Sequence, residues 1–161
     1  MYNLLVTSSE GAWDLPAYEF DQTRFLEYTA DTLQAKYKKL TASVIEELKA
    51  FPTLFAYEGA DRPTRVGYIR RIKERGRSIL IEYEFDESIK PFSFVELLPL
   101  LVKLDIEQWE MSRTHWALKD EDLFEMLALA SLVDKQLVEG EVCWSNFRGH
   151  LDRWKPPGRE T

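Results

Sequence analysis

The sequence is short of cysteine, histidine and glycine, and each shortage excludes a class of site. The single cysteine, Cys143, forms no intramolecular disulfide, and with only two histidines the chain lacks the thiolate and imidazole ligands of a structural zinc site. Seven glycines stand singly along the chain, so no glycine-rich loop is present to hold a phosphate. We therefore expect no cofactor, no metal site and a location in the reducing cytoplasm.

Long hydrophobic runs are also missing. The longest nearly apolar stretch, residues 92–104, is interrupted by polar residues and a proline. A helix that crosses a bilayer needs roughly 20 consecutive apolar residues. The sequence therefore predicts no membrane partner.

Positive charge is scarce and unevenly distributed. The chain has 21 basic and 28 acidic residues, a net charge of −7, which argues against general affinity for nucleic acid or anionic lipid. Residues 62–77 reverse this balance, because they include seven basic residues and a single acid, Glu74. The basic residues are Arg62, Arg65, Arg70, Arg71, Lys73, Arg75 and Arg77.

The apolar content is sufficient for a core, since 45% of the 161 residues are hydrophobic. Residues 53–58, 64–73 and 78–85 have the pattern of three antiparallel strands. Gly76 suits a positive φ in the turn between the last two, and Gly67 suggests a bulge or sharp bend within the second. We predict an α+β fold in which a small, strongly bent antiparallel β-meander packs with flanking helices. An SH3-like barrel is one form that such a meander takes.

Segments predicted to be helical lie before and after this meander in the sequence. Before it we expect a short strand over residues 24–28, a helix over residues 30–38 and a second helix that begins at Thr41 or Ser43. After it we expect helical structure from residue 91 onward and a helix over residues 121–133 with Asp120 as its N-cap. The expected core residues are Phe55, Val66, Ile69, Ile79, Ile81, Phe85, Leu97, Leu98, Trp109, Trp116, Leu123 and Leu127.

The chain is predicted to form a single α+β domain over residues 1–133, followed by a short helical C-terminal extension and tail over residues 134–161. The predicted helix 121–133 is apolar nearly all round, so it is either central in the fold or half exposed to a partner. For a docking surface we select Leu127, Leu129 and Leu132. The expected partner is another protein or a second copy of this chain.

His115 is the first candidate for catalysis, because few groups in the chain titrate near neutrality. Together with Arg113 it could serve a metal-independent nuclease, the imidazole moving a proton and the guanidinium stabilising the phosphorane. The alternative, which we favour, is that both residues hold a helix–loop–helix junction together through hydrogen bonds to carboxylates and backbone.

The most specific feature is a cluster of cations at the predicted turn, here called the basic hairpin. It comprises Arg70, Arg71, Lys73, Arg75 and Arg77. Its size suits the groove of a nucleic acid or an acidic partner. The same cations also suit an edge strand that resists aggregation and pairs with Glu58, Glu82 and Glu84. Binding to nucleic acid would be weak and sensitive to salt, because the rest of the chain is acidic.

Three segments, RFLEYT, ELKAFPTLFAYEG and RTHWALKDEDLF, resemble an uncharacterised accessory module at the N-termini of bacterial multidomain proteins, where effector or signalling domains follow it. The resemblance covers residues 20–133 and contains no catalytic motif, so it implies an accessory or sensing role and no site residues. We therefore expect a non-enzymatic bacterial protein-interaction or regulatory module. Nucleic-acid binding by the basic hairpin is the first alternative, and a nuclease that uses Arg113 and His115 is the second.

Overall fold

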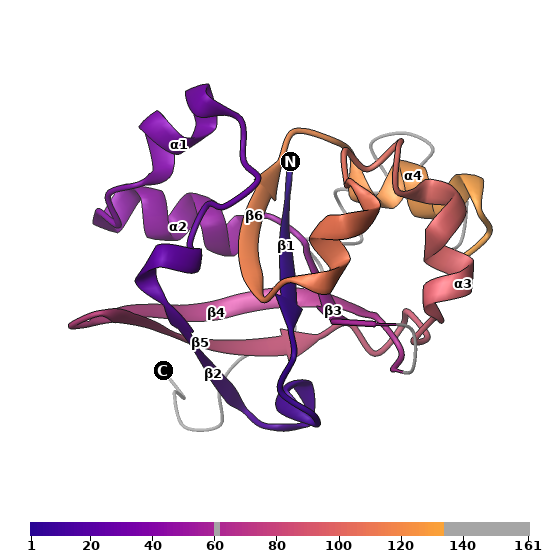
Figure 1. Cartoon of the computed structure of the whole chain (residues 1–161), viewed down its shortest axis with the longest axis horizontal. Coiled ribbons are helices and arrows are strands. Elements are labelled where there is room, and N and C mark those ends of the chain that lie inside the picture. Colours follow the sequence, from indigo (N-terminus) through magenta and orange to yellow (C-terminus); the bar gives the residue numbers. More distant parts are fainter. Residues whose placement is uncertain (60–61, 134–161) are drawn as a thin grey trace, which may run out of the picture.

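One open sheet with helices on both faces forms the molecule (Figure 1). The computed structural model describes residues 1–59 and 62–133. Within these ranges the strands form a mixed sheet in the order β2-β5-β4-β3-β1-β6. The strands are β1 (Tyr2–Thr7), β2 (Ala17–Asp21), β3 (Thr53–Tyr57), β4 (Arg65–Arg75), β5 (Ser78–Phe85) and β6 (His115–Lys119).

The predicted α+β class is confirmed, and β3, β4 and β5 form the predicted antiparallel meander. The SH3-like barrel is wrong, because the sheet does not close. β1 pairs in parallel with the free edge of β3, and β6 pairs antiparallel with β1. At the other edge β2 pairs antiparallel with β5, so the meander is extended on both sides into an open sheet.

The helices divide between the two faces of the sheet. α1 (Asp31–Tyr37) and α2 (Ala42–Ala50) pack on one face, whereas α3 (Phe94–Leu97) and α4 (Leu123–Leu129) pack on the other (Figure 1). Short 3-10 helices complete the connections. They are η1 (Ala12–Asp14), η2 (Gln22–Arg24), η3 (Leu98–Leu100) and η4 (Gln108–Ser112).

Strand β1 shows why the sheet has two hydrophobic cores. Its residues are all buried, and successive side chains point to opposite faces. Leu4 and Val6 pack in the core beneath α3 and α4, while Leu5 packs with Trp13 and with Leu48 of α2. A strand covered on both faces is therefore apolar almost without interruption.

Two glycines in the meander have separate roles. Gly76 adopts a φ of 60° in the turn between β4 and β5, as predicted. The bulge in β4 lies between Ile69 and Arg71, beyond the predicted position at Gly67. Gly67 is required for another reason, since a Cβ atom there would lie 2.1 Å from the backbone oxygen of Glu84 on β5.

Two segments fold differently from the prediction. Residues 24–28 form no strand, because left-handed φ values of 65° at Leu26 and 54° at Tyr28 interrupt the extended backbone. A single bridge links Phe25 to Trp116, and the strand lies earlier in the chain, at β2. The predicted helix–loop–helix junction around His115 is also wrong, because this segment is the edge strand β6.

The remaining differences concern helix ends and core positions. The last helix is shorter than residues 121–133, and its N-cap is Asp122 in place of Asp120. The second helix begins after Thr41, one of the two predicted caps. Among the expected core residues, Leu98 and Trp109 are exposed. Residues 134–161, for which a helical extension was predicted, lie outside the described residues.

Candidate functional site

His115, the catalytic candidate, is enclosed at the start of β6. Its side chain is fully buried, with Nδ1 at 2.6 Å from the carbonyl oxygen of Arg113 and Nε2 at 3.7 Å from Oε2 of Glu110. The ring of Tyr28 covers it edge-on, with ring centroids 4.8 Å apart. The imidazole therefore faces other parts of the protein.

Lys119 and Glu110 form a buried ion pair next to this ring. Lys119 Nζ lies 3.0 Å from Glu110 Oε2 and donates to the carbonyl oxygen of Tyr28 at 2.8 Å. Burial raises the pKa of Glu110, but the His115 ring, the backbone N–H of Glu107 and the Lys119 ammonium outweigh it and hold this pKa below its ordinary value. The pair joins η4, β6 and the loop before α1.

The guanidinium of Arg113 turns to a different partner. It donates to the carboxylate of Glu27 at 2.7 and 3.3 Å, and Arg24 donates to the same carboxylate at 3.1 Å. Burial raises the pKa of Glu27, but the two guanidinium groups outweigh it and lower this pKa. A nuclease would need the guanidinium and the imidazole at a common phosphate. The geometry favours the interpretation that Arg113 and His115 hold the local structure together.

These contacts keep residues 25–29 against the outer edge of β6. The backbone N–H of Leu26 donates to the carbonyl oxygen of Trp116 at 2.7 Å, and the hydroxyl of Thr29 accepts from the backbone N–H of Leu118 at 2.9 Å. An edge strand covered in this way does not offer its free backbone groups to another chain. The loop and the buried ion pair together close one end of the sheet.

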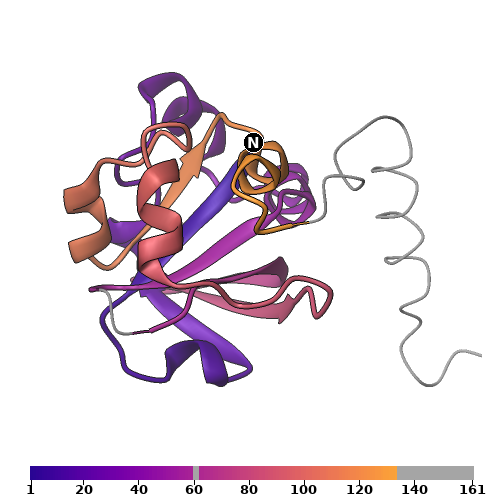
Figure 2. The same ribbon diagram turned by 90° about the vertical axis from the view of Figure 1, so that its right-hand side faces the viewer.

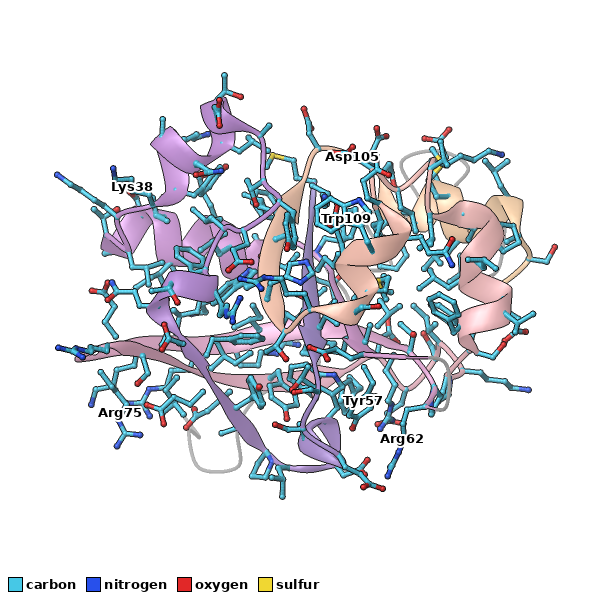
Figure 3. The ribbon with its side chains drawn as sticks, in the orientation of Figure 1. Lys38, Tyr57, Arg62, Arg75, Asp105 and Trp109 are labelled. Atoms are coloured by element: carbon cyan, nitrogen blue, oxygen red, sulfur yellow. The ribbon has the colours of Figure 1, made fainter. Side chains whose placement is uncertain are left out.

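The basic hairpin extends past the rest of the sheet (Figure 1), with Arg75 at its far end (Figure 3). Two of its cations pair across the sheet, Arg70 with Glu84 at 3.1 Å and Arg71 with Glu82 at 3.5 Å. The predicted partner Glu58 is engaged elsewhere and accepts from the hydroxyl of Thr114 at 2.7 Å. In the part of the chain that the structure describes, three hairpin cations form no ion pair, and they are Lys73, Arg75 and Arg77.

A helical stretch formed by α3, η3 and the turns that follow carries apolar side chains on two opposite faces. We call it α3–η3, residues 94–104. Its inner face is buried in the core and comprises Leu97, Leu100, Leu101 and Leu104. Its outer face comprises Val95, Leu98 and Val102, whose side chains are 72%, 41% and 90% exposed. Figure 2, which looks onto the α3 side of the molecule, shows this stretch at the surface.

Both ends of α3–η3 are fixed by local hydrogen bonds. At the start, the hydroxyl of Ser93 accepts from the backbone N–H of Glu96, whose carboxylate accepts from the backbone N–H of Ser93. At the end, Asp105 adopts a φ of 58° and the N–H of Ile106 donates to the carbonyl oxygen of Leu101 at 2.8 Å, which is a Schellman motif. The outer face is therefore held in a defined orientation.

The docking surface expected on α4 is only partly available. Leu127 is fully buried in the core, Leu132 is partly buried, and Leu129 is 59% exposed. α3–η3 also carries apolar side chains on both faces, and more of them are exposed than on α4. The sequence carried a signal for it, because Val95, Leu98 and Val102 recur at spacings of three and four residues.

Within residues 1–59 and 62–133, no three His, Cys, Asp or Glu side chains are grouped closely enough to hold a metal ion. In the same ranges no helix has the length and apolar character needed to cross a membrane. Comparison with protein-family models, with curated protein sequences and with solved structures finds no match for this chain.

Proposed function

We propose that the chain is a non-enzymatic protein-interaction module that binds its partner through the outer face of α3–η3. The observation that carries the proposal is the exposure of Val95, Leu98 and Val102 on a helical stretch whose opposite face is part of the core. Because the inner face is anchored, the outer face is already ordered and loses little conformational entropy on binding. In line with the resemblance described above, we propose a regulatory role in the bacterial cytoplasm.

The outer face suits the centre of an interface. Complete burial of a Val or Leu side chain is worth about 1.5–3 kcal/mol. From Val95 to Val102 the outer face spans about 10 Å along the helix axis. This length fits a partner helix that lies alongside. Glu96 and Lys103 follow Val95 and Val102 in the sequence, and their side chains are exposed. They suit the polar rim of an interface centred on the outer face.

The proposal is tested with the immobilised full chain, the Val95→Lys/Val102→Lys variant and a Leu15→Lys control. Leu15 is 60% exposed and precedes β2, so the control changes an exposed aliphatic residue elsewhere. Proteins that the wild type and the control retain from a cell lysate are purified. The affinity of each retained protein for the wild type, the double variant and the control is then measured by titration calorimetry. We expect the double variant to bind at least tenfold more weakly. Equal affinities for wild type and double variant would contradict the proposal.

Nucleic-acid binding by the basic hairpin is a second candidate function, favoured by the three hairpin cations that form no ion pair within the described ranges. Neutralisation of three phosphates would give a slope of log affinity against log salt of about −2.7. Fluorescence anisotropy with labelled DNA and RNA at low salt should show weaker binding by Arg75→Glu than by Arg62→Glu, whose arginine pairs with Glu10. Absence of binding at low salt would remove this candidate.

A further inference from the structure

We propose that the free edge of β2 is a second binding surface, which takes an extended partner segment of alternating basic and apolar residues as an added strand. This surface is separate from the outer face of α3–η3 and goes beyond the proposed function. The two ends of the sheet differ. At one end residues 25–29 lie along β6. At the other end, in the part of the chain that the structure describes, β5 is the only strand beside β2.

The pairing of β2 with β5 determines which backbone groups face outward. The N–H of Gln22 donates to the carbonyl oxygen of Arg77 at 2.8 Å, and this pair continues the register in which Phe20 lies opposite Ile79. In an antiparallel ladder, hydrogen-bonded pairs alternate with pairs that form no bond. The intervening residues of β2 therefore turn their N–H and carbonyl groups away from β5. They are Ala17, Glu19 and Asp21. Pro16, which has no N–H, bounds this edge at its start.

The free edge is already extended and ordered in the absence of a partner. Phe20 is buried in the core, and the hydroxyl of Tyr18 accepts from the hydroxyl of Thr7 at 2.8 Å. The carboxylate of Asp21 accepts from the backbone N–H of Thr23 at 2.9 Å, at the end of the strand. An ordered edge loses little conformational entropy when a strand is added. Strand addition takes its affinity from backbone hydrogen bonds, which the outward groups supply.

The charges of the free edge favour a basic partner over a second copy of the chain. Glu19 and Asp21 are exposed, and their side chains share one face of the sheet because successive side chains of a strand point to opposite faces. The antiparallel register that pairs the whole of β2 with a second copy places Glu19 opposite itself, and like charges directly opposite are destabilising. A partner strand with lysine or arginine at alternate positions places cations there instead.

The other face of the free edge suits apolar side chains. Tyr18 is partly buried, and the centroid of its ring lies 4.6 Å from that of Phe20 and 5.0 Å from that of Trp13. An apolar side chain between two basic ones in the added strand would lie beside Tyr18 and cover more of its ring. The expected occupant is therefore an extended segment in which basic and apolar residues alternate.

An NMR titration of the isotope-labelled full chain tests the inference. The probe is a synthetic peptide of about seven residues in which lysine alternates with valine. We expect the amide signals of Ala17, Glu19 and Asp21 to shift, and Glu19→Lys to weaken binding about tenfold, because an attractive charge becomes a repulsive one. The Glu125→Lys control reverses an exposed charge on α4 and should bind as the wild type does. Equal weakening by both variants, or no shifts at about 1 mM peptide, overturns the inference.

Backbone-methylated peptides test the geometry without a change in the protein. In antiparallel pairing the peptide lysines lie opposite Glu19 and Asp21 and direct their N–H groups toward β2, whereas the valine N–H groups face away. Methylation of the lysine backbone nitrogens should abolish binding, and methylation of the valine backbone nitrogens should leave the affinity within about twofold. If methylation of the lysine nitrogens leaves the affinity unchanged, no strand is added and the inference is overturned.

The Val95→Lys/Val102→Lys variant separates this inference from the proposed function. It should bind the lysine–valine peptide as the wild type does, because it leaves β2 unchanged. Loss of peptide binding in this variant would place the peptide on the outer face of α3–η3 and overturn the inference.

Discussion

At the residue scale, the end of the sheet depends on two charges that the fold has removed from water. Lys119 is satisfied by Glu110 and by the carbonyl oxygen of Tyr28, and Glu110 also accepts from the backbone N–H of Glu107 at 3.1 Å. A buried ion pair contributes little relative to apolar residues, but loss of one partner leaves the other charge buried alone. The pair therefore makes a strong test of the local structure.

We expect Lys119→Met to lower the free energy of unfolding by about 3–5 kcal/mol, because the Glu110 carboxylate then loses its buried cation. Urea unfolding measures the loss as a lower midpoint at constant slope. The double variant Glu110→Leu/Lys119→Met removes both charges and should recover most of the loss. A single variant within about 1 kcal/mol of the wild type would contradict the assignment.

The same carboxylate predicts a pH dependence. The pKa of Glu110 is lowered in the folded protein, so its contribution to stability is complete above the ordinary glutamate value of about 4.3. This contribution is lost as the pH falls below that value and through the lowered pKa of the folded state. Thermal unfolding from about pH 6 to about pH 3 should show a steeper loss in the wild type than in Glu110→Gln.

Glu125→Gln serves as the control for this experiment, because Glu125 is exposed on α4. The stability of the Glu125→Gln variant should follow that of the wild type across the pH range. If all three curves run parallel, Glu110 does not carry the acid sensitivity.

Residue identities were predictable where burial follows a periodic pattern. Ile79 and Ile81 alternate along β5 and are buried as expected. Lys119 gave no signal, because a charged residue at the end of a strand is ordinarily exposed, and only the packing of residues 25–29 over β6 encloses it. Trp109 was expected in the core for its size, yet it packs edge-on against Tyr28 at 4.6 Å between ring centroids and stays 56% exposed.

At the element scale, the meander depends on the close approach of β4 and β5 at Gly67. We expect Gly67→Ala to lower the free energy of unfolding by about 3 kcal/mol, since the new Cβ would lie 2.1 Å from the Glu84 carbonyl oxygen and the backbones would have to separate. Gly76→Asn is the control, because asparagine tolerates a positive φ and the space around the turn is open. Thermal unfolding compares them, and equal losses would contradict the role given to Gly67.

Elements with a single clear period were predictable from the sequence, and elements buried on two sides were not. β3, β4 and β5 were found from alternation and from Gly76. β6 is buried throughout, from His115 to Lys119, and so short a segment with only three apolar residues in the middle has no period that separates a strand from a helix. In α3–η3 both Leu97 and Leu98 were expected in the core, because sequence spacing does not show which of the two points inward.

At the scale of the whole molecule, the sheet is assembled from strands far apart in the sequence. Leu5 of β1 lies opposite Phe55 of β3 on one side and opposite Trp116 of β6 on the other. Local propensity and turn signals do not encode such pairings, so the fold class was predictable while the strand order and the parallel pair were not. The same limit applies to the candidate site. Its outer face is defined by which side of α3–η3 the sheet covers.

The proposed docking role of this face is tested most directly by a photo-crosslinking residue placed at Val102 of the full chain and irradiated in a cell lysate. The same residue placed at Leu15 is the control, because both side chains are exposed. We expect crosslinks from position 102 to a partner protein in several-fold higher yield than from position 15. Equally low yields at the two positions would show that the outer face of α3–η3 is bare surface and would contradict the docking role.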